Sequence, residues 1–328
     1  MIYRLIHNNK SHHFIALPLL ALVLWIGALI NPVEHHFAID LTHQIPLAQP
    51  LFLINQWSPL ASSIVALVLT ILTALLLVQT NHRYLFLEQK TFLPGYLFVI
   101  IIGGLVSLKY LNPLYVTNVL GSIALIHIFD SPRENTSLST LFNTGFIFGI
   151  CSLFYLSFVF LLPLVWIAFQ LITKNINWRH FALPLMGLIL PWIHVASYYY
   201  FIDQIPLLIE IIQNNFSIPE HLIFGDMTML YYIAFIILLA AMSSIGIFFT
   251  FEKRGSTHRY FFQTYLAIGV ASPLLVIFIP SVSKEMLLTV IAPIACILAN
   301  YLIVIPSKFW ANIILFVLLL IVIYIQFA

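Results

Sequence analysis

The chain has 328 residues, of which 62% are hydrophobic and only 7% are charged, and its mean hydropathy is +1.05. An ordinary soluble domain has about 25% charged residues, so this composition excludes a soluble globular enzyme, a disordered chain and a nucleic-acid-binding protein. The net charge of +2 is too small to indicate an anionic partner. We therefore expect an all-α, polytopic membrane protein, embedded in the lipid bilayer, whose few charges report its topology.

Eleven apolar segments approach the length of about 20 residues that a helix needs to cross the hydrocarbon core. In chain order they cover residues 14–30, 60–79, 93–108, 113–129, 141–154, 157–172, 181–201, 227–249, 261–279, 286–304 and 309–327. The first segment is long for a signal peptide and lacks a cleavage site after it, so we expect a retained helix. The fifth and sixth segments form either one long bent helix or two short helices in a hairpin, and their joint length favours the hairpin.

The basic residues test this count of segments. With the N-terminus inside, eleven of the thirteen Lys and Arg residues fall on the cytoplasmic side, and only Lys109 and Lys284 face outward. This distribution is what the positive-inside rule requires. Merging the fifth and sixth segments would move Lys174 and Arg179 to the wrong side. We therefore predict eleven spans in a bacterial inner membrane, with the C-terminus outside.

Two outward loops, at residues 31–59 and 203–226, are longer than the others and contain no Lys or Arg. Each includes a short amphipathic stretch, at 45–56 and at 205–212, which we expect to lie along the membrane interface with its apolar face in lipid. No repeat or soluble domain is visible, so residues 1–328 are interpreted as one membrane domain. Cys151 and Cys296 lie in apolar segments, which predicts packing residues rather than a disulfide or a metal pair.

A polar cluster follows the first segment: Glu34, His35 and His36, and then Asp40 and His43. A carboxylate at a lipid–water boundary is a candidate general base toward a hydroxyl, because desolvation can raise its pKa. His35 and His36 are candidates for substrate binding beside it. A divalent metal site is an alternative, although the spacing matches no established metal signature. A polar loop that wets the membrane surface is the other alternative.

Three further features suggest either function or packing. Lys109 is a candidate for holding a lipid phosphate at the outer face, unless it only snorkels to the interface. His194 lies within the seventh segment, where an ionisable group is either a substrate-binding candidate or a hydrogen-bond donor to a neighbouring helix. Gly145 and Gly149 are four residues apart, which predicts close packing of two helices.

Two stretches resemble an uncharacterised multi-pass inner-membrane family of Bacteroidota, over most of the first 200 residues. They are TFLP at 91–94, which follows a basic inner loop, and LFNTGFIFGICSLFY at 141–155. More distantly, the layout resembles GT-C-type glycosyltransferases, which use polyprenyl-linked sugar donors. That resemblance implies a GT-C-like module of seven helices in residues 1–201, followed by an outer loop and four further helices in residues 202–328. It also implies that Glu34 or Asp40 is the catalytic carboxylate of the first outer loop, and that residues 45–56 are its interfacial helix.

Three functions are compatible with these observations. In a GT-C-like transferase, Glu34 or Asp40 would act as the base, and Lys109 would hold the polyprenyl phosphate of the sugar donor. A non-catalytic membrane subunit of an envelope or secretion assembly, bound to a membrane protein partner, fits the small loops and the lack of a nucleotide-binding motif. A lipid or small-solute transporter fits the prolines that interrupt several spans, although their positions show no repeat symmetry: Pro163, Pro184, Pro191, Pro273 and Pro293. None of the three requires a cofactor, apart from the divalent metal already considered.

Overall fold

The computed structural model describes residues 12–32, 44–130, 137–173, 177–217, 227–250, 256–279, 284–305 and 307–327, and most of these are helical, with no strand among them. The α-helices are α2 (His13–Ile30), α3 (Gln49–Trp57), α4 (Pro59–Tyr84), α5 (Leu93–Gly103), α6 (Pro113–Asp130), α7 (Ser137–Phe154), α8 (Leu162–Thr173), α9 (Trp178–Phe201), α10 (Ile205–Ser217), α11 (Met227–Thr250), α12 (Ser256–Phe278), α13 (Leu287–Val304) and α14 (Lys308–Phe327). Three short 3-10 helices are η2 (Val106–Leu108), η3 (Leu156–Leu161) and η6 (Lys284–Met286).

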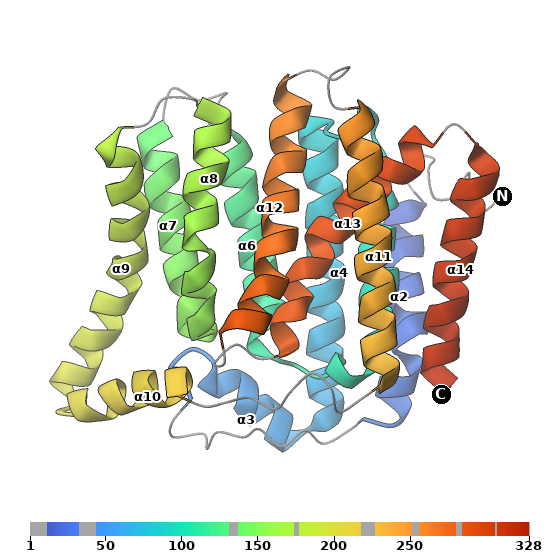
Figure 1. Ribbon diagram of the computed structural model, residues 1–328. Coiled ribbons are helices and arrows are strands. Elements are labelled where there is room, and N and C mark those ends of the chain that lie inside the picture. The colour runs from blue at the N-terminus through green and yellow to red at the C-terminus, as the bar shows by residue number, and fades with distance from the viewer. Residues whose placement is uncertain are drawn as a thin grey trace.

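Every apolar segment expected from the sequence contains a helix in the structure, although the helix of the third segment ends early, at Gly103. Eight of these helices are long and apolar enough to cross a membrane by length and composition, and three shorter apolar helices correspond to α5, α7 and α8. The predicted hairpin at 141–172 is confirmed, because α7 and α8 are separate helices that η3 connects (Figure 1). The protein is thus a polytopic helical membrane protein.

The bundle has two different ends (Figure 1). Helices α3 and α10 lie across one end, which we name the α3 end, while the long helices run roughly perpendicular to them. The helix termini that carry Arg83, Arg179 and Lys308 lie at the opposite end, whereas Lys109 lies in the α5–α6 connection at the α3 end. This separation of charge agrees with the distribution expected from the sequence.

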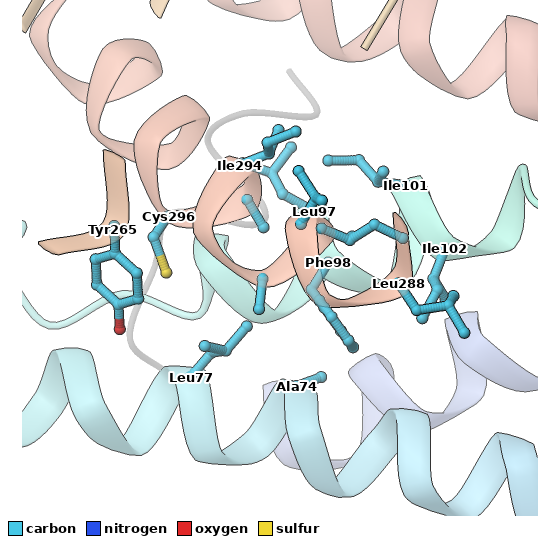
Figure 2. Close-up of a cluster of buried hydrophobic side chains, with 14 of the residues drawn as sticks. Ala74, Leu77, Leu97, Phe98, Ile101, Ile102, Tyr265, Leu288, Ile294 and Cys296 are labelled. Carbon is cyan, nitrogen blue, oxygen red and sulfur yellow. The ribbon is translucent and has the colours of Figure 1, made fainter. Parts of the chain in front are cut away.

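Helices α5 and α13 form the centre of the bundle. Every residue of α5 is buried, and 83% of α13 is buried. Figure 2 shows side chains of both helices, among them Leu97 and Phe98 of α5 and Leu288 and Ile294 of α13, gathered above Leu77 of α4. Both helices are apolar on all sides, as expected for helices enclosed by other helices.

Helices α7 and α9 meet backbone to backbone at three glycines. A Cβ atom on Gly145 would lie 2.1 Å from the Pro184 carbonyl oxygen, and one on Gly187 would lie 2.3 Å from that of Phe142. Gly149 approaches the Leu188 carbonyl in the same way, at 2.6 Å. The prediction that Gly145 and Gly149 serve close helix packing is confirmed, since small residues allow such an approach in membranes.

Both amphipathic stretches are helices, α3 and α10. Their apolar faces do not lie wholly in lipid, which corrects the expectation. Phe52 of α3 and Leu208 and Ile211 of α10 are buried in a small second core that also contains Leu156 and Tyr199. The outward positions, such as Trp57, stay exposed. The two helices therefore cover the α3 end of the bundle.

Candidate functional site at the α3 end

The connection between α5 and α6, residues 104–112, is irregular backbone enclosed by the protein. The third apolar segment was expected to be helical to residue 108, but α5 ends at Gly103. Apart from Val106 and Ser107, the connection is buried. Irregular backbone inside a membrane protein requires internal hydrogen bonds, because the lipid core offers none. We name these nine residues the 104–112 segment.

Side chains from distant helices cap the end of α5. Tyr232 of α11 donates a hydrogen bond from its hydroxyl to the Ile101 carbonyl at 2.7 Å, and Gln326 of α14 donates to the Gly103 carbonyl at 2.8 Å. Gly104 lies so close to the Tyr232 ring that an added Cβ would be 2.3 Å from it. The last carbonyls of α5 thus find donors, and the glycine is needed for the close approach.

Lys109 is the central charged residue of the segment. Its side chain is 4% exposed, and its Nζ donates to the Leu24 carbonyl of α2 at 2.6 Å. Nζ also lies 5.3 Å from the centre of the Trp25 ring, which is cation–π distance. Lys109 therefore binds α2 inside the protein and does not snorkel to the surface.

The buried position changes the protonation chemistry of Lys109. Burial lowers the pKa of Lys109 from 10.5 to about 8, because desolvation disfavours the charged form. No ion pair to Lys109 is present among the described residues. An ammonium has three N–H donors, and the Leu24 carbonyl uses one of them. When Lys109 is protonated, its ammonium therefore has further N–H donors that could bind another acceptor.

Two further donors lack an acceptor within the described part of the chain: the Nε1–H of Trp25, whose ring lies beside Lys109, and the Nδ2–H of Asn112, which follows Lys109 in the same segment. Both side chains are fully buried. A buried donor without an acceptor is costly, so a polar or anionic group beside it would stabilise the arrangement. Lys109, Trp25 and Asn112 together make this region rich in hydrogen-bond donors.

A second set of hydrogen bonds fixes the other half of the segment. Asn55 of α3 donates to the Leu111 carbonyl at 2.6 Å, and the Leu111 N–H donates to the Ser62 hydroxyl of α4 at 2.8 Å. The Ser62 hydroxyl in turn donates to the Asn55 side-chain oxygen. Nearby, the Tyr110 hydroxyl donates to Glu285 of η6. These bonds hold the segment against α3, α4 and the start of α13.

The other candidates from the first outer loop, Glu34, His35, His36 and Asp40, lie outside the described residues, as does His43. The residues that flank them, Pro32 after α2 and Gln44 before α3, lie at the α3 end, which is also the end of Lys109 (Figure 1). The described residues contain no group of three His, Cys, Asp or Glu that could hold a metal ion. Metal binding by the undescribed histidines and acids stays a prediction.

His194 is not part of this site. It lies on the exposed side of α9, and its Nδ1 is 2.8 Å from the Leu190 carbonyl of its own helix. Helix α9 stands at one edge of the bundle, while α2, which contacts Lys109, stands toward the other (Figure 1). The structure thus does not bring His194 and Lys109 together.

Two partly open cavities in the described bundle are small and apolar. One of about 50 Å³ lies between α6, α8, α12 and α13 beside Pro293, and one of about 40 Å³ lies between α5, α11 and α13 beside Pro273. Such volumes hold a few water molecules. Pro184 and Pro191 pack against the α7 glycines instead of lining a cavity. Pro184 and Pro191 therefore contribute to the packing of α9 against α7.

Sequence reasoning missed several residues of this site, above all Trp25, Asn55, Ser62, Tyr110, Asn112, Tyr232 and Glu285. The sequence did contain one local signal, the Gly103-Gly104 pair followed by Asn112-Pro113, because glycine pairs and Asn-Pro mark breaks in a helix. The capping residues had no such signal, since each depends on a contact between distant parts of the chain.

The fold and this site define a polytopic helical membrane protein with a buried lysine in the connection between two helices, at one end of the bundle. The chain belongs to a family of unknown function, DUF6427, whose model matches residues 5–328. No curated protein matches the chain.

Proposed function

We propose that the protein is a GT-C-like transferase that moves a sugar from a polyprenyl phosphate donor onto a hydroxyl at the α3 end. The observation that carries the proposal is the group of buried donors around Lys109, at the same end as both flanks of the acidic first loop. A buried cation without a carboxylate partner is unfavourable, so an anionic ligand would compensate it. A phosphate on a lipid carrier supplies that charge at the membrane surface.

In the proposed reaction, Glu34 or Asp40 takes the proton of the acceptor hydroxyl. The hydroxyl oxygen then forms a bond to the anomeric carbon, and the bond from that carbon to the donor phosphate oxygen breaks. The polyprenyl phosphate leaves with the electron pair and one additional negative charge. Lys109 would stabilise that charge, because donors fixed in advance act most strongly where charge develops. His35 and His36 would position the acceptor.

Several parts of the layout support this proposal. Helices α2 and α4 to α9 would be the seven-helix module, α3 the interfacial helix of the first loop, and α11 to α14 the additional helices. The α3 end would face outward from a bacterial inner membrane, with the N-terminus in the cytoplasm. The large basic excess at the opposite end agrees with that orientation.

The test is the pair of substitutions Glu34→Gln and Asp40→Asn, each in cells that lack the native protein. We expect one of them to lower the lipid-linked glycan product by about 100-fold or more, since a general base contributes 10²–10⁴-fold. The product is measured by mass spectrometry of extracted lipids, at equal protein levels. Glu210→Gln, on the exposed side of α10, is the control acid and should leave the product unchanged. Full activity of both variants would reject the proposal and favour a non-catalytic membrane subunit.

A further inference from the structure

A groove of about 450 Å³ opens between the first turns of α7 and α9, at the end opposite to α3. It is much larger than the two small apolar cavities and falls within the range of ligand pockets, about 300–1,000 Å³. Its lining from α7 includes Phe142 and Asn143, and its lining from α9 includes Arg179, Ala182 and Met186. It takes no part in the site around Lys109.

The glycine contacts account for the position of this groove. Gly145 on α7 touches the backbone of Pro184 on α9, which draws the two helices together at that level. The groove residues of α7, and those of α9 apart from Met186, precede these two positions, so most of the groove lies between the contact and the end of the bundle.

The groove has an apolar floor and a cationic rim. Phe142, Leu183 and Met186 provide apolar surface, and Met186 continues onto the exposed side of α9. Arg179 lies on the rim, exposed, with its guanidinium carbon 6.0 Å from the centre of the Trp178 ring. No carboxylate is among the described residues that line the groove. The rim therefore has a positive charge beside an aromatic side chain.

We propose that this groove binds an anionic phospholipid, with the phosphate at Arg179 and one acyl chain along the apolar floor. Arg binds phosphate through paired N–H donors, and Trp favours the headgroup region of a bilayer. Helix α9, which forms one wall of the groove, stands at the edge of the bundle, so surrounding lipid would reach the groove (Figure 1). The charge of the rim and the apolar floor match the two parts of such a lipid.

The experiment measures retention of phosphatidylglycerol and phosphatidylcholine by the purified full chain, using native mass spectrometry from mixed micelles. Arg179→Gln should lower phosphatidylglycerol retention by about tenfold and leave phosphatidylcholine unchanged, since it removes only the charge-assisted contact. Ala182→Leu should lower retention of both lipids, because the larger side chain fills the groove. Unchanged melting temperatures in detergent will show that the variants are folded.

Lys308→Gln is the matched control. Lys308 is an exposed cation at the same end of the bundle, at the start of α14 and next to Phe309 and Trp310, but it borders no groove among the described cavities. We expect its phosphatidylglycerol retention to stay within about twofold of the wild type, as for a screened surface charge. An equal loss in both charge variants, no loss in Arg179→Gln, or displacement of the lipid by millimolar inorganic phosphate would each overturn the proposal.

Discussion

The two ends of the bundle hold their charged and polar side chains in different ways. At the end opposite to α3, Arg83 forms an ion pair with Asp130 at 2.8 Å, and Arg83 is 46% exposed. At the α3 end, Lys109 is buried and bonded to a backbone carbonyl, with no ion pair in the described structure. Arg83 therefore has an acidic partner and is partly exposed to solvent. Lys109 has no acidic partner among the described residues and is shielded from solvent.

Two buried asparagines repeat this difference. Asn81, near the end of α4, donates to the Gln89 and Thr91 carbonyls and accepts from the Leu87 N–H, so it closes the α4–α5 connection. Asn112, in the 104–112 segment, accepts from Leu114, but its Nδ2 has no acceptor within the described residues. Structural polar groups are normally satisfied within the fold. Buried polar atoms without a partner among the described residues also occur at the opposite end, at His82 in the last turn of α4 and at Arg259 in the first turn of α12, so the amide of Asn112 does not by itself distinguish the two ends.

The largest effect on stability is expected from Asn55→Leu. The substitution leaves the Leu111 carbonyl and the Ser62 hydroxyl without Asn55 in a buried position, and it should lower the free energy of unfolding by about 2–4 kcal/mol. The thermal midpoint in detergent measures the change. Asn312→Leu is the control, since Asn312 donates to Lys308 within its own helix on an exposed surface, and it should change stability by less than about 0.5 kcal/mol. Equal midpoints for the two variants would show that the 104–112 segment does not depend on α3.

The substitution Lys109→Met should have different effects on the stability of the protein and on its transferase activity. The pKa of Lys109 is about 8 in the folded chain and 10.5 when it is unperturbed, so between these pH values the unfolded chain binds more protons. Wild-type stability should therefore rise from pH 8 to pH 10.5, by on the order of 3 kcal/mol, while the Met variant lacks this rise.

At pH 7 the Met variant should be at least as stable as the wild type, because it buries no charge, but it should lose transferase activity. The midpoints in detergent at pH 7 and pH 10, together with the product assay at pH 7, test both statements. A wild type whose stability is flat over this range would mean that Lys109 has a compensating partner in the folded chain.

The smallest effect is expected from Arg83→Gln at the opposite end. Half-exposed ion pairs contribute about 0–1 kcal/mol, so the thermal midpoint should move little and should depend on salt in the wild type. Activity should be unchanged, because Arg83 lies at the other end of the bundle from the proposed site. A loss as large as that of Asn55→Leu would remove the distinction between the two ends.

Much of the fold was predictable from the sequence, because a membrane helix is a local property. Apolar length alone located the helices, and the basic residues favoured separating α7 from α8. The glycine contact was also predictable, since Gly145 and Gly149 lie on one side of a helix. Apolar length also predicted a helix over residues 104–108, where α5 has already ended. Those residues are apolar because they are buried, so their composition does not distinguish an irregular segment from a helix.

The site was less predictable, because its chemistry depends on contacts between distant residues. Lys109 was identified as a rare outward cation, but its burial depends on Leu24 and Trp25, far away in sequence. Asn55 and Tyr232 looked like ordinary residues of an interfacial helix and of a span. The roles of Glu34, Asp40, His35 and His36 stay predictions, and His194 points to its own helix backbone.

Both cysteines of the chain, Cys151 and Cys296, are free and buried among apolar side chains. A thiol in that position is shielded from water-soluble reagents, and the thiolate, which is the reactive form, is disfavoured there. The natural sequence is therefore already a background in which a single cysteine introduced at either end of the bundle would be the accessible target of a membrane-impermeant maleimide. The side of the membrane that each end faces can thus be read in intact cells without first removing any native residue.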